Sequence, residues 1–147
     1  LTLHCLGCGA GMTQIYRGEP SSSWALRYDS DLLMQADLGA GVVRAALQHL
    51  GQLPSTLLIS HNHTDHAAEL PVALAVEALQ KGRKMRVVSA PDVMCRLQEH
   101  RMHEMLSTGR PLQEFAEWVE APEGETIHLE HEDRSPEKRL EITTHRA

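Results

Sequence analysis

The sequence is poor in the features on which several classes of protein depend. It contains two Trp, two Tyr and one Phe, too few for an aromatic platform that stacks single-stranded nucleic acid. Its three cysteines, an odd number, do not indicate a disulfide framework. Acidic residues outnumber basic ones by 20 to 14, which argues against a broad basic surface for nucleic acid. No signal peptide and no apolar run of about 18 residues are visible, so no membrane partner is expected.

What remains is the composition of an ordinary globular protein. Apolar residues make up 41% and charged residues 23% of the 147 positions, which excludes wholesale disorder. At ~100–200 residues per domain, the length predicts one domain that spans residues 1–147. Cysteines without an evident disulfide pattern favour a reducing, cytoplasmic location.

The hydrophobic pattern predicts strands first, followed by alternating strands and helices. Strands are predicted at 1–6, 24–28, 32–36, 56–60, 85–89, 126–129 and 140–143, and helices at 42–50, 67–81, 91–106 and 111–119. The turn at 29–31 predicts a hairpin between the second and third strands, and 130–139 reads as a charged connector. This order predicts a layered α/β domain.

Three of the 10 histidines fall between positions 61 and 66, directly after the apolar strand predicted at 56–60. His61 and His63 are two positions apart, so in an extended segment they point to the same side. Asp65 and His66 follow where the chain enters the next predicted helix, at the strand end where open α/β sheets place their sites. Imidazole and carboxylate together suit Zn²⁺ or a similar ion, so these four residues are predicted metal ligands. A surface loop with clustered histidines is the alternative, and it does not explain the strand and helix on either side.

The run His61-x-His63-x-Asp65-His66 resembles the signature of the metallo-β-lactamase-fold hydrolases. Other residues resemble the ribonuclease Z-like branch in the same order: the glycine loop at 6–11, the serines at 21–23, Asp37-Leu38-Gly39 and Leu70-Pro71. The resemblance covers residues 1 to about 95. Cys8 and Glu69 depart from it, since the branch usually has a small hydroxyl residue and a glycine at these two positions.

The resemblance implies an αββα metallo-β-lactamase sandwich and a hydrolase with two Zn²⁺ ions per complete site. His61 and His63 would bind one ion and Asp65 and His66 the other, with a metal-bound hydroxide as the nucleophile. Asp65 would also be catalytic by orienting that nucleophile, and Asp37 would hold the histidine loop without binding metal. A ribonuclease Z-like phosphodiesterase that acts on RNA or a small phosphodiester is the expected enzyme.

A complete site of this kind also needs a third His, a bridging Asp and a final His. His145, after the strand predicted at 140–143, is the candidate for the third His; the other downstream histidines, His100, His103, His128 and His131, fit exposed positions better. We therefore expect the chain to be the N-terminal portion of a larger hydrolase that by itself binds metal weakly and turns over little substrate. A natural short form is the alternative.

Other functions stay open on the same scaffold. A hydrolase of thioesters, lactones or sulfate esters would have a similar set of ligands, because specificity lies in the surrounding loops. A non-catalytic scaffold member of the fold is the third hypothesis, and the intact ligand run argues against it. A homodimer is considered as well.

Two glycine and cysteine patterns near the N-terminus have weaker functional interpretations. Gly7-x-Gly9-x-Gly11 follows a strand as a dinucleotide-binding loop would, but the third glycine is out of place and no helix is predicted after it. Cys5 and Cys8 have the spacing of a redox or metal-binding pair. A strand that runs into a turn accounts for this pair, while a metal site with His4 stays open.

Overall fold

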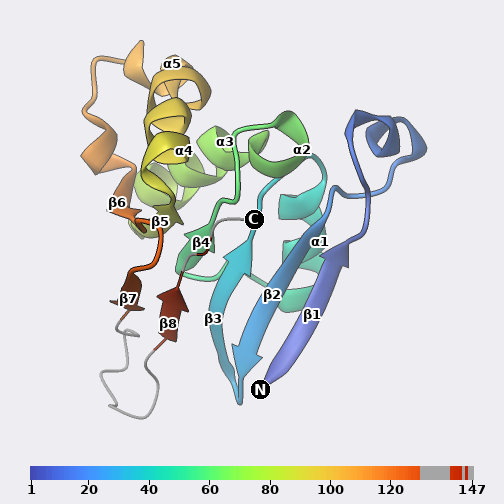
Figure 1. Cartoon of the computed structure of the whole chain (residues 1–147). Coiled ribbons are helices and arrows are strands. Elements are labelled where there is room, and N and C mark those ends of the chain that lie inside the picture. The colour runs from blue at the N-terminus through green and yellow to red at the C-terminus, as the bar shows by residue number, and fades with distance from the viewer. Residues whose placement is uncertain (130–139, 144, 146–147) are drawn as a thin grey trace.

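Six strands form one mixed sheet in the order β1-β2-β3-β4-β5-β6. The computed structural model describes residues 1–129, 140–143 and 145. The strands are β1 (Thr2–Gly7), β2 (Ser23–Tyr28), β3 (Asp31–Ala36), β4 (Thr56–Leu58), β5 (Met85–Ser89) and β6 (Ala116–Glu120). β1, β2 and β3 are antiparallel neighbours, whereas β3, β4, β5 and β6 run parallel. The carboxyl ends of the four parallel strands therefore share one edge of the sheet, toward which the arrowhead of β3 points in Figure 1.

Helices connect the parallel strands, as right-handed crossovers between parallel strands require. They are α1 (Val42–Leu50), α2 (Thr64–Ala67), α3 (Leu70–Ala75), α4 (Pro91–Arg96) and α5 (His103–Leu106), with π-helical turns η2 (Val76–Gln80) and η3 (Leu97–Arg101) and 3₁₀ turns η1 (Met12–Arg17) and η4 (Leu112–Glu114). Among the residues that the structure describes, no helix is long and apolar enough to cross a membrane.

The two faces of the sheet are covered by different layers. Successive residues alternate between the faces, so Leu57 and Val87 pack in the larger core with residues of the helices, whereas Leu58 and Val88 face the other way. That second face packs against Ile127 and Ile142, which lie on the small antiparallel sheet of β7 (Thr126–Leu129) and β8 (Leu140–Thr143). Figure 1 shows these two strands side by side. The predicted layered α/β arrangement is confirmed.

The helix predicted at 111–119 is wrong, because the segment forms only a short 3₁₀ turn, η4, and then enters strand β6 at Ala116. β6 pairs in parallel with β5 from Met85↔Ala116 to Ser89↔Glu120. Phe115 and Ala116 are buried at its start, so pairing and burial override the local helical spacing.

Other boundaries shift by a few residues. The strand predicted at 56–60 ends at Leu58, and the helical segment predicted to begin at 67 begins at Thr64 instead. The connector predicted at 130–139, with His131, lies outside the described residues.

Candidate metal centre

The histidine run lies at the shared carboxyl edge of the parallel strands. β4 ends at Leu58, residues 59–63 form the loop that we call the histidine loop, and α2 begins at Thr64. The neighbouring strand β3 ends at Ala36, so Asp37 leaves the sheet beside the histidine loop and Asp37 N donates to Leu58 O over 2.8 Å. Two neighbouring strand ends thus bring together residues that are more than 20 positions apart in the sequence.

Within the described part of the chain, His61, His63 and Asp65 form a group that could hold a metal ion. One ligand atom from each residue lies within 4.8 Å of the others. The rings of His61 and His63 have centroids 4.7 Å apart. A nitrogen–nitrogen–carboxylate donor set at this separation leaves room for an ion whose ligands bind at about 2.0–2.2 Å, so the residues fit a zinc-like ion.

His66 lies beside this group. Its ring centroid is 3.8 Å from that of His61, and its Nε2 is 3.4 Å from Asp65 Oδ2. All four predicted ligands are therefore neighbours in space. The structure groups Asp65 with His61 and His63 as well as with His66, whereas the resemblance paired Asp65 with His66 alone.

Asp37 anchors both His66 and the histidine loop. Its Oδ2 lies 2.7 Å from His66 Nδ1, so an Nδ1–H of His66 donates to Asp37, and Nε2 is the ring nitrogen on the side of Asp65. Ser60 N donates to Asp37 Oδ1 over 2.8 Å, and Ser60 Oγ donates to the same carboxylate over 2.9 Å. Asp37 has a left-handed backbone with φ 60°, which turns its carboxylate toward the loop.

The glycine loop at 6–11 reaches Asp65 from the other side. Gly11 N donates to Asp65 Oδ2 over 3.1 Å. Gly39 lies so close to α2 that a Cβ on it would overlap the carbonyl oxygen of Asp65. These approaches fix the start of α2, where Asp65 and His66 lie, against the loop after β3.

Arg101, from the helix region after β5, holds the middle of the histidine loop. Its Nη2 donates to Asn62 O over 2.8 Å, and its Nε donates to Asn62 Oδ1 over 3.2 Å. Arg101 is the last residue of the π-helical turn η3, and such turns are common at functional sites. Since Asn62 lies between His61 and His63, Arg101 positions the backbone from which both side chains project.

Glu69 joins the site to helix α1. Its two carboxylate oxygens accept hydrogen bonds from Gly41 N over 2.8 Å and from Val43 N over 2.7 Å. An acidic side chain at the N-terminus of α1 satisfies backbone donors that lack helical partners and interacts well with the helix dipole. The departure from glycine at this position thus has a structural role, which the sequence did not reveal.

The electrostatics of the site favour a neutral imidazole at His61. Burial, followed by the neighbouring His66 and His63, lowers the pKa of His61 below its ordinary value, against a smaller opposing effect of Asp37 and Asp65. A neutral imidazole has the lone pair that a metal requires, so His61 is in its ligand form at neutral pH.

Sequence reasoning identified some parts of this centre and missed others. It named the four candidate ligands and Asp37. It missed Ser60, although its place directly before His61 was a signal, and Arg101, which no local pattern connects to the loop. His145 is exposed and is not part of the group formed by His61, His63 and Asp65.

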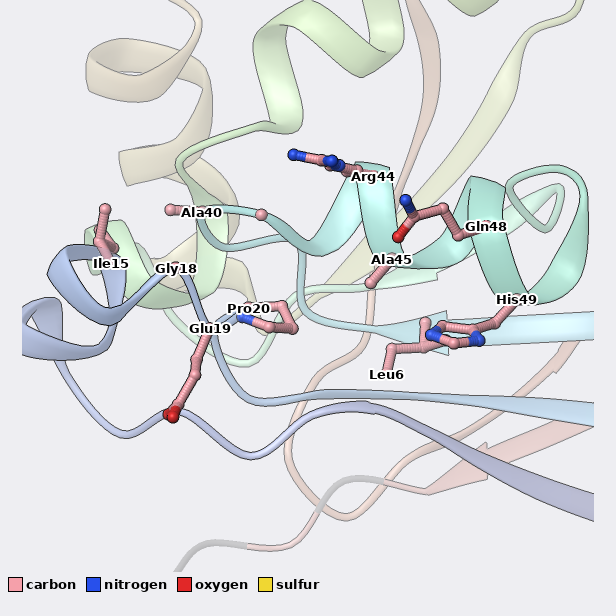
Figure 2. A pocket seen from close by; sticks show the side chains of 11 residues that line it. Leu6, Ile15, Gly18, Glu19, Pro20, Ala40, Arg44, Ala45, Gln48 and His49 are labelled. Carbon is pink, nitrogen blue, oxygen red and sulfur yellow. The ribbon is translucent and has the colours of Figure 1, made fainter.

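A cavity of about 490 Å³ lies between α1 and the loop that follows η1. It lies apart from the four predicted ligands His61, His63, Asp65 and His66, which we call the histidine cluster. Figure 2 shows Arg44, Gln48 and His49 projecting from α1, with Glu19 and Pro20 on the opposite side. None of the residues that line it belongs to the histidine cluster, and the donor set for a metal lies in the cluster instead.

Comparisons with known proteins agree with this architecture. No protein-family model matches the chain, and no curated protein matches it. Among solved structures, it is similar to the short form of human tRNase Z, with 20% identity and a TM-score of 0.57 over 92% of this chain and 49% of that one. It is also similar to the metallo-β-lactamase fold protein YhfI of Bacillus subtilis, with 12% identity and a TM-score of 0.58 over 85% of this chain and 47% of that one. Zn²⁺-bound PqqB of Methylobacterium extorquens matches with 13% identity and a TM-score of 0.60 over 85% and 47%.

The chain has the metallo-β-lactamase fold, as the histidine run predicted. It spans about half the length of these solved proteins.

Proposed function

We propose that this chain belongs to a metal-dependent hydrolase and provides metal ligands of its active centre. The observation that supports this most is the convergence of His61, His63 and Asp65 at the shared carboxyl edge of the sheet, beside His66. When bound there, Zn²⁺ would supply a Lewis acid that activates water at neutral pH. His61, His63, Asp65 and His66 are the residues that would hold it, in line with the zinc carried by PqqB, one of the similar proteins.

The surrounding residues orient the ligands. Asp37 accepts a hydrogen bond from His66 Nδ1–H, so that Nε2 is the ring nitrogen that would bind the metal. Ser60 links Asp37 to His61, because its Oγ donates to the Asp37 carboxylate and lies 3.0 Å from His61 Nδ1. Gly11 N donates to Asp65 Oδ2, the carboxylate oxygen that also lies 3.4 Å from His66 Nε2, and neutralises part of its charge. This position supports the catalytic role proposed for Asp65, which is to orient an attacking water.

The proposed substrate is a phosphodiester, either RNA or a smaller compound. Support comes from the tRNase Z match and from the glycine loop at 6–11, which approaches Asp65 in space. Hydrolysis of a thioester, lactone or sulfate ester is the second candidate, since the same ligands serve those reactions.

Zinc titration of the chain tests the metal proposal. The wild-type chain should bind Zn²⁺, and His61→Ala, His63→Ala and Asp65→Asn should each weaken binding by at least ~10-fold, because each removes a ligand. His49→Ala is the matched control, since His49 is exposed on α1 and outside the cluster. Binding that is equal in the wild type and in all three ligand variants would overturn the proposal.

A substrate panel on the whole protein that contains this chain tests the reaction. Zinc-loaded protein should hydrolyse bis-p-nitrophenyl phosphate, and a chelator or His63→Ala should abolish this activity. Turnover of a thioester alone would support the second candidate. Tight zinc binding without turnover of either ester would indicate the non-catalytic scaffold.

A further inference from the structure

Two exposed cysteines meet where strand β1 leads into the glycine loop. Cys5 Sγ and Cys8 Sγ lie 3.3 Å apart, close enough for one thiol to donate to the other. Both residues are exposed, and both are free cysteines in this structure. Cys5 lies on β1, an edge strand of the sheet, so solvent can reach the pair.

A β-bulge brings the two thiols to the same side. In a regular strand, residues three positions apart point to opposite faces, because side chains alternate with a period of two. Cys5 pairs with Trp24 and Gly7 pairs with Ser23, so one extra residue, Leu6, is inserted between these two register positions. Such an insertion reverses the alternation. Cys8 therefore returns to the side on which Cys5 lies.

The backbone after Cys8 is held in place. Gly9 N donates to Pro20 O over 3.2 Å, and Ser22 N donates to Gly9 O over 2.8 Å. Gly7 packs so closely against the chain at 20–21 that a Cβ would overlap the carbonyl oxygen of Ser21. The proximity of the thiols is thus a property of a tightly packed loop and not of two free chain ends.

We propose that Cys5 and Cys8 form a redox-active dithiol site that closes to an intramolecular disulfide by exchange with small-molecule disulfides such as oxidised glutathione. In the first step, the thiolate of one cysteine attacks a sulfur of the oxidised glutathione, which forms a mixed disulfide and releases one glutathione thiolate. In the second step, the other cysteine loses its proton and attacks the protein sulfur of the mixed disulfide, which releases the second glutathione. Two protein thiols are oxidised and one disulfide is reduced to two glutathione thiols.

The neighbouring thiol also changes the ionisation of Cys8. The hydrogen bond to Cys5 and the charge of the Cys5 thiolate raise the pKa of Cys8 above its ordinary value. Whichever cysteine attacks first, the other one resolves the mixed disulfide. Closing the S–S bond to about 2.05 Å requires the sulfurs to approach, and rotation of these exposed side chains supplies that movement.

Mass spectrometry of the folded chain tests the proposal. The reduced protein is incubated with oxidised glutathione, free thiols are alkylated, and peptides are mapped. The wild type should lose two hydrogen atoms and yield a peptide with a Cys5–Cys8 disulfide. Cys8→Ser should retain one glutathione on Cys5. Cys95→Ser is the matched control, because Cys95 is an exposed cysteine on another element and its removal should leave closure unchanged.

A second measurement separates the folded geometry from simple nearness in sequence. The equilibrium constant for closure should be at least ~10-fold larger in the folded protein than in urea, because the bulge raises the effective concentration of one thiol near the other. An equal or smaller constant in the folded protein would overturn the proposal. Stable glutathione on both cysteines, or both thiols remaining open to alkylation, would overturn it as well.

Discussion

Asp37 combines a left-handed backbone with a carboxylate that accepts hydrogen bonds from His66 and Ser60. Asp37→Asn tests this carboxylate with little backbone strain, since asparagine also tolerates the left-handed region. The amide of asparagine has no negative charge. Its NH₂ group would face either His66 or Ser60, which are themselves donors, so one of these hydrogen bonds is lost. We expect the affinity for Zn²⁺ to fall by ~10–100-fold, the usual effect of losing a partner of a metal-binding histidine. Competition with a fluorescent chelator measures it, and an affinity equal to that of the wild type would contradict this role.

Arg101 acts one step further from the ligands, through Asn62. Arg101→Gln removes the two donors that hold the histidine loop, so His61 and His63 should become less well positioned. The affinity for Zn²⁺ should fall by less than the ~10–100-fold expected for a direct partner. Arg96→Gln, one turn earlier on α4, is the control. If both variants bind zinc as the wild type does, Arg101 does not position the loop.

For single residues, the sequence predicted those members of the candidate site that lie close together in the chain. His61, His63, Asp65 and His66 fall within one short run, so their chemistry is visible without a structure. Arg101 contacts Asn62 across 39 positions, and the contact arises only when the helices after β5 pack beside β4. The role of Glu69 at the N-terminus of α1 depends on packing in the same way.

Among the elements, the helix formed by α3 and η2 ends in an ion-pair cluster around Glu77. The side chain of Glu77 is only 3% exposed and accepts hydrogen bonds from Lys81 Nζ and from Arg83 Nε, each over 2.9 Å. Arg83 Nη2 also donates to Leu53 O, so the cluster ties the end of the helix to the segment before β4. Burial alone would raise the pKa of Glu77, but the hydrogen bonds from Lys81 and Arg83 outweigh it and hold the pKa below the ordinary value of 4.5.

Glu77→Gln should therefore destabilise the fold in a pH-dependent way. A depressed folded-state pKa gives stability that is fully present above the unfolded-state pKa and is lost as pH falls through the folded-state pKa. At pH 7 we expect a loss of about 2 kcal/mol, less than the ~3–5 kcal/mol of a fully buried pair because Lys81 is half exposed. Urea unfolding from pH 7 to pH 3 measures the difference between variant and wild type. This difference in the free energy of unfolding should stay constant above about pH 5.5 and shrink below 4.5. A difference independent of pH would contradict the role of the Glu77 charge.

The error at 111–119 shows why elements are harder to predict than motifs. The segment has helical spacing of apolar residues, yet its chain runs beside β5 and takes up the hydrogen bonds of the last parallel strand. Parallel pairing joins residues about 31 positions apart, such as Met85 and Ala116, and local sequence does not encode it. The segments at 42–50 and 85–89, by contrast, form as predicted because their own patterns are strong.

For the whole molecule, the proposed metal binding should be linked to folding, because the contacts from Gly11, Asp37 and Arg101 that position the candidate ligands exist only in the folded chain. Saturating Zn²⁺ should stabilise the protein by about 2.7 kcal/mol at 100 times its dissociation constant, provided that the unfolded chain does not bind it. Thermal unfolding with Zn²⁺ and with a chelator measures this effect. The difference in melting temperature between zinc and chelator should be much smaller for His61→Ala than for the wild type. A wild-type melting temperature that is the same with and without zinc would contradict the linkage.

The hydrogen bond from Gly11 N to Asp65 Oδ2 spans 54 positions of the chain and ends at a candidate ligand. The amide proton of Gly11 is therefore a local reporter of whether the glycine loop is docked on the metal centre. Its exchange with deuterated solvent is slow only while that loop remains closed over Asp65. One backbone resonance thus measures how often the centre opens, without any substrate.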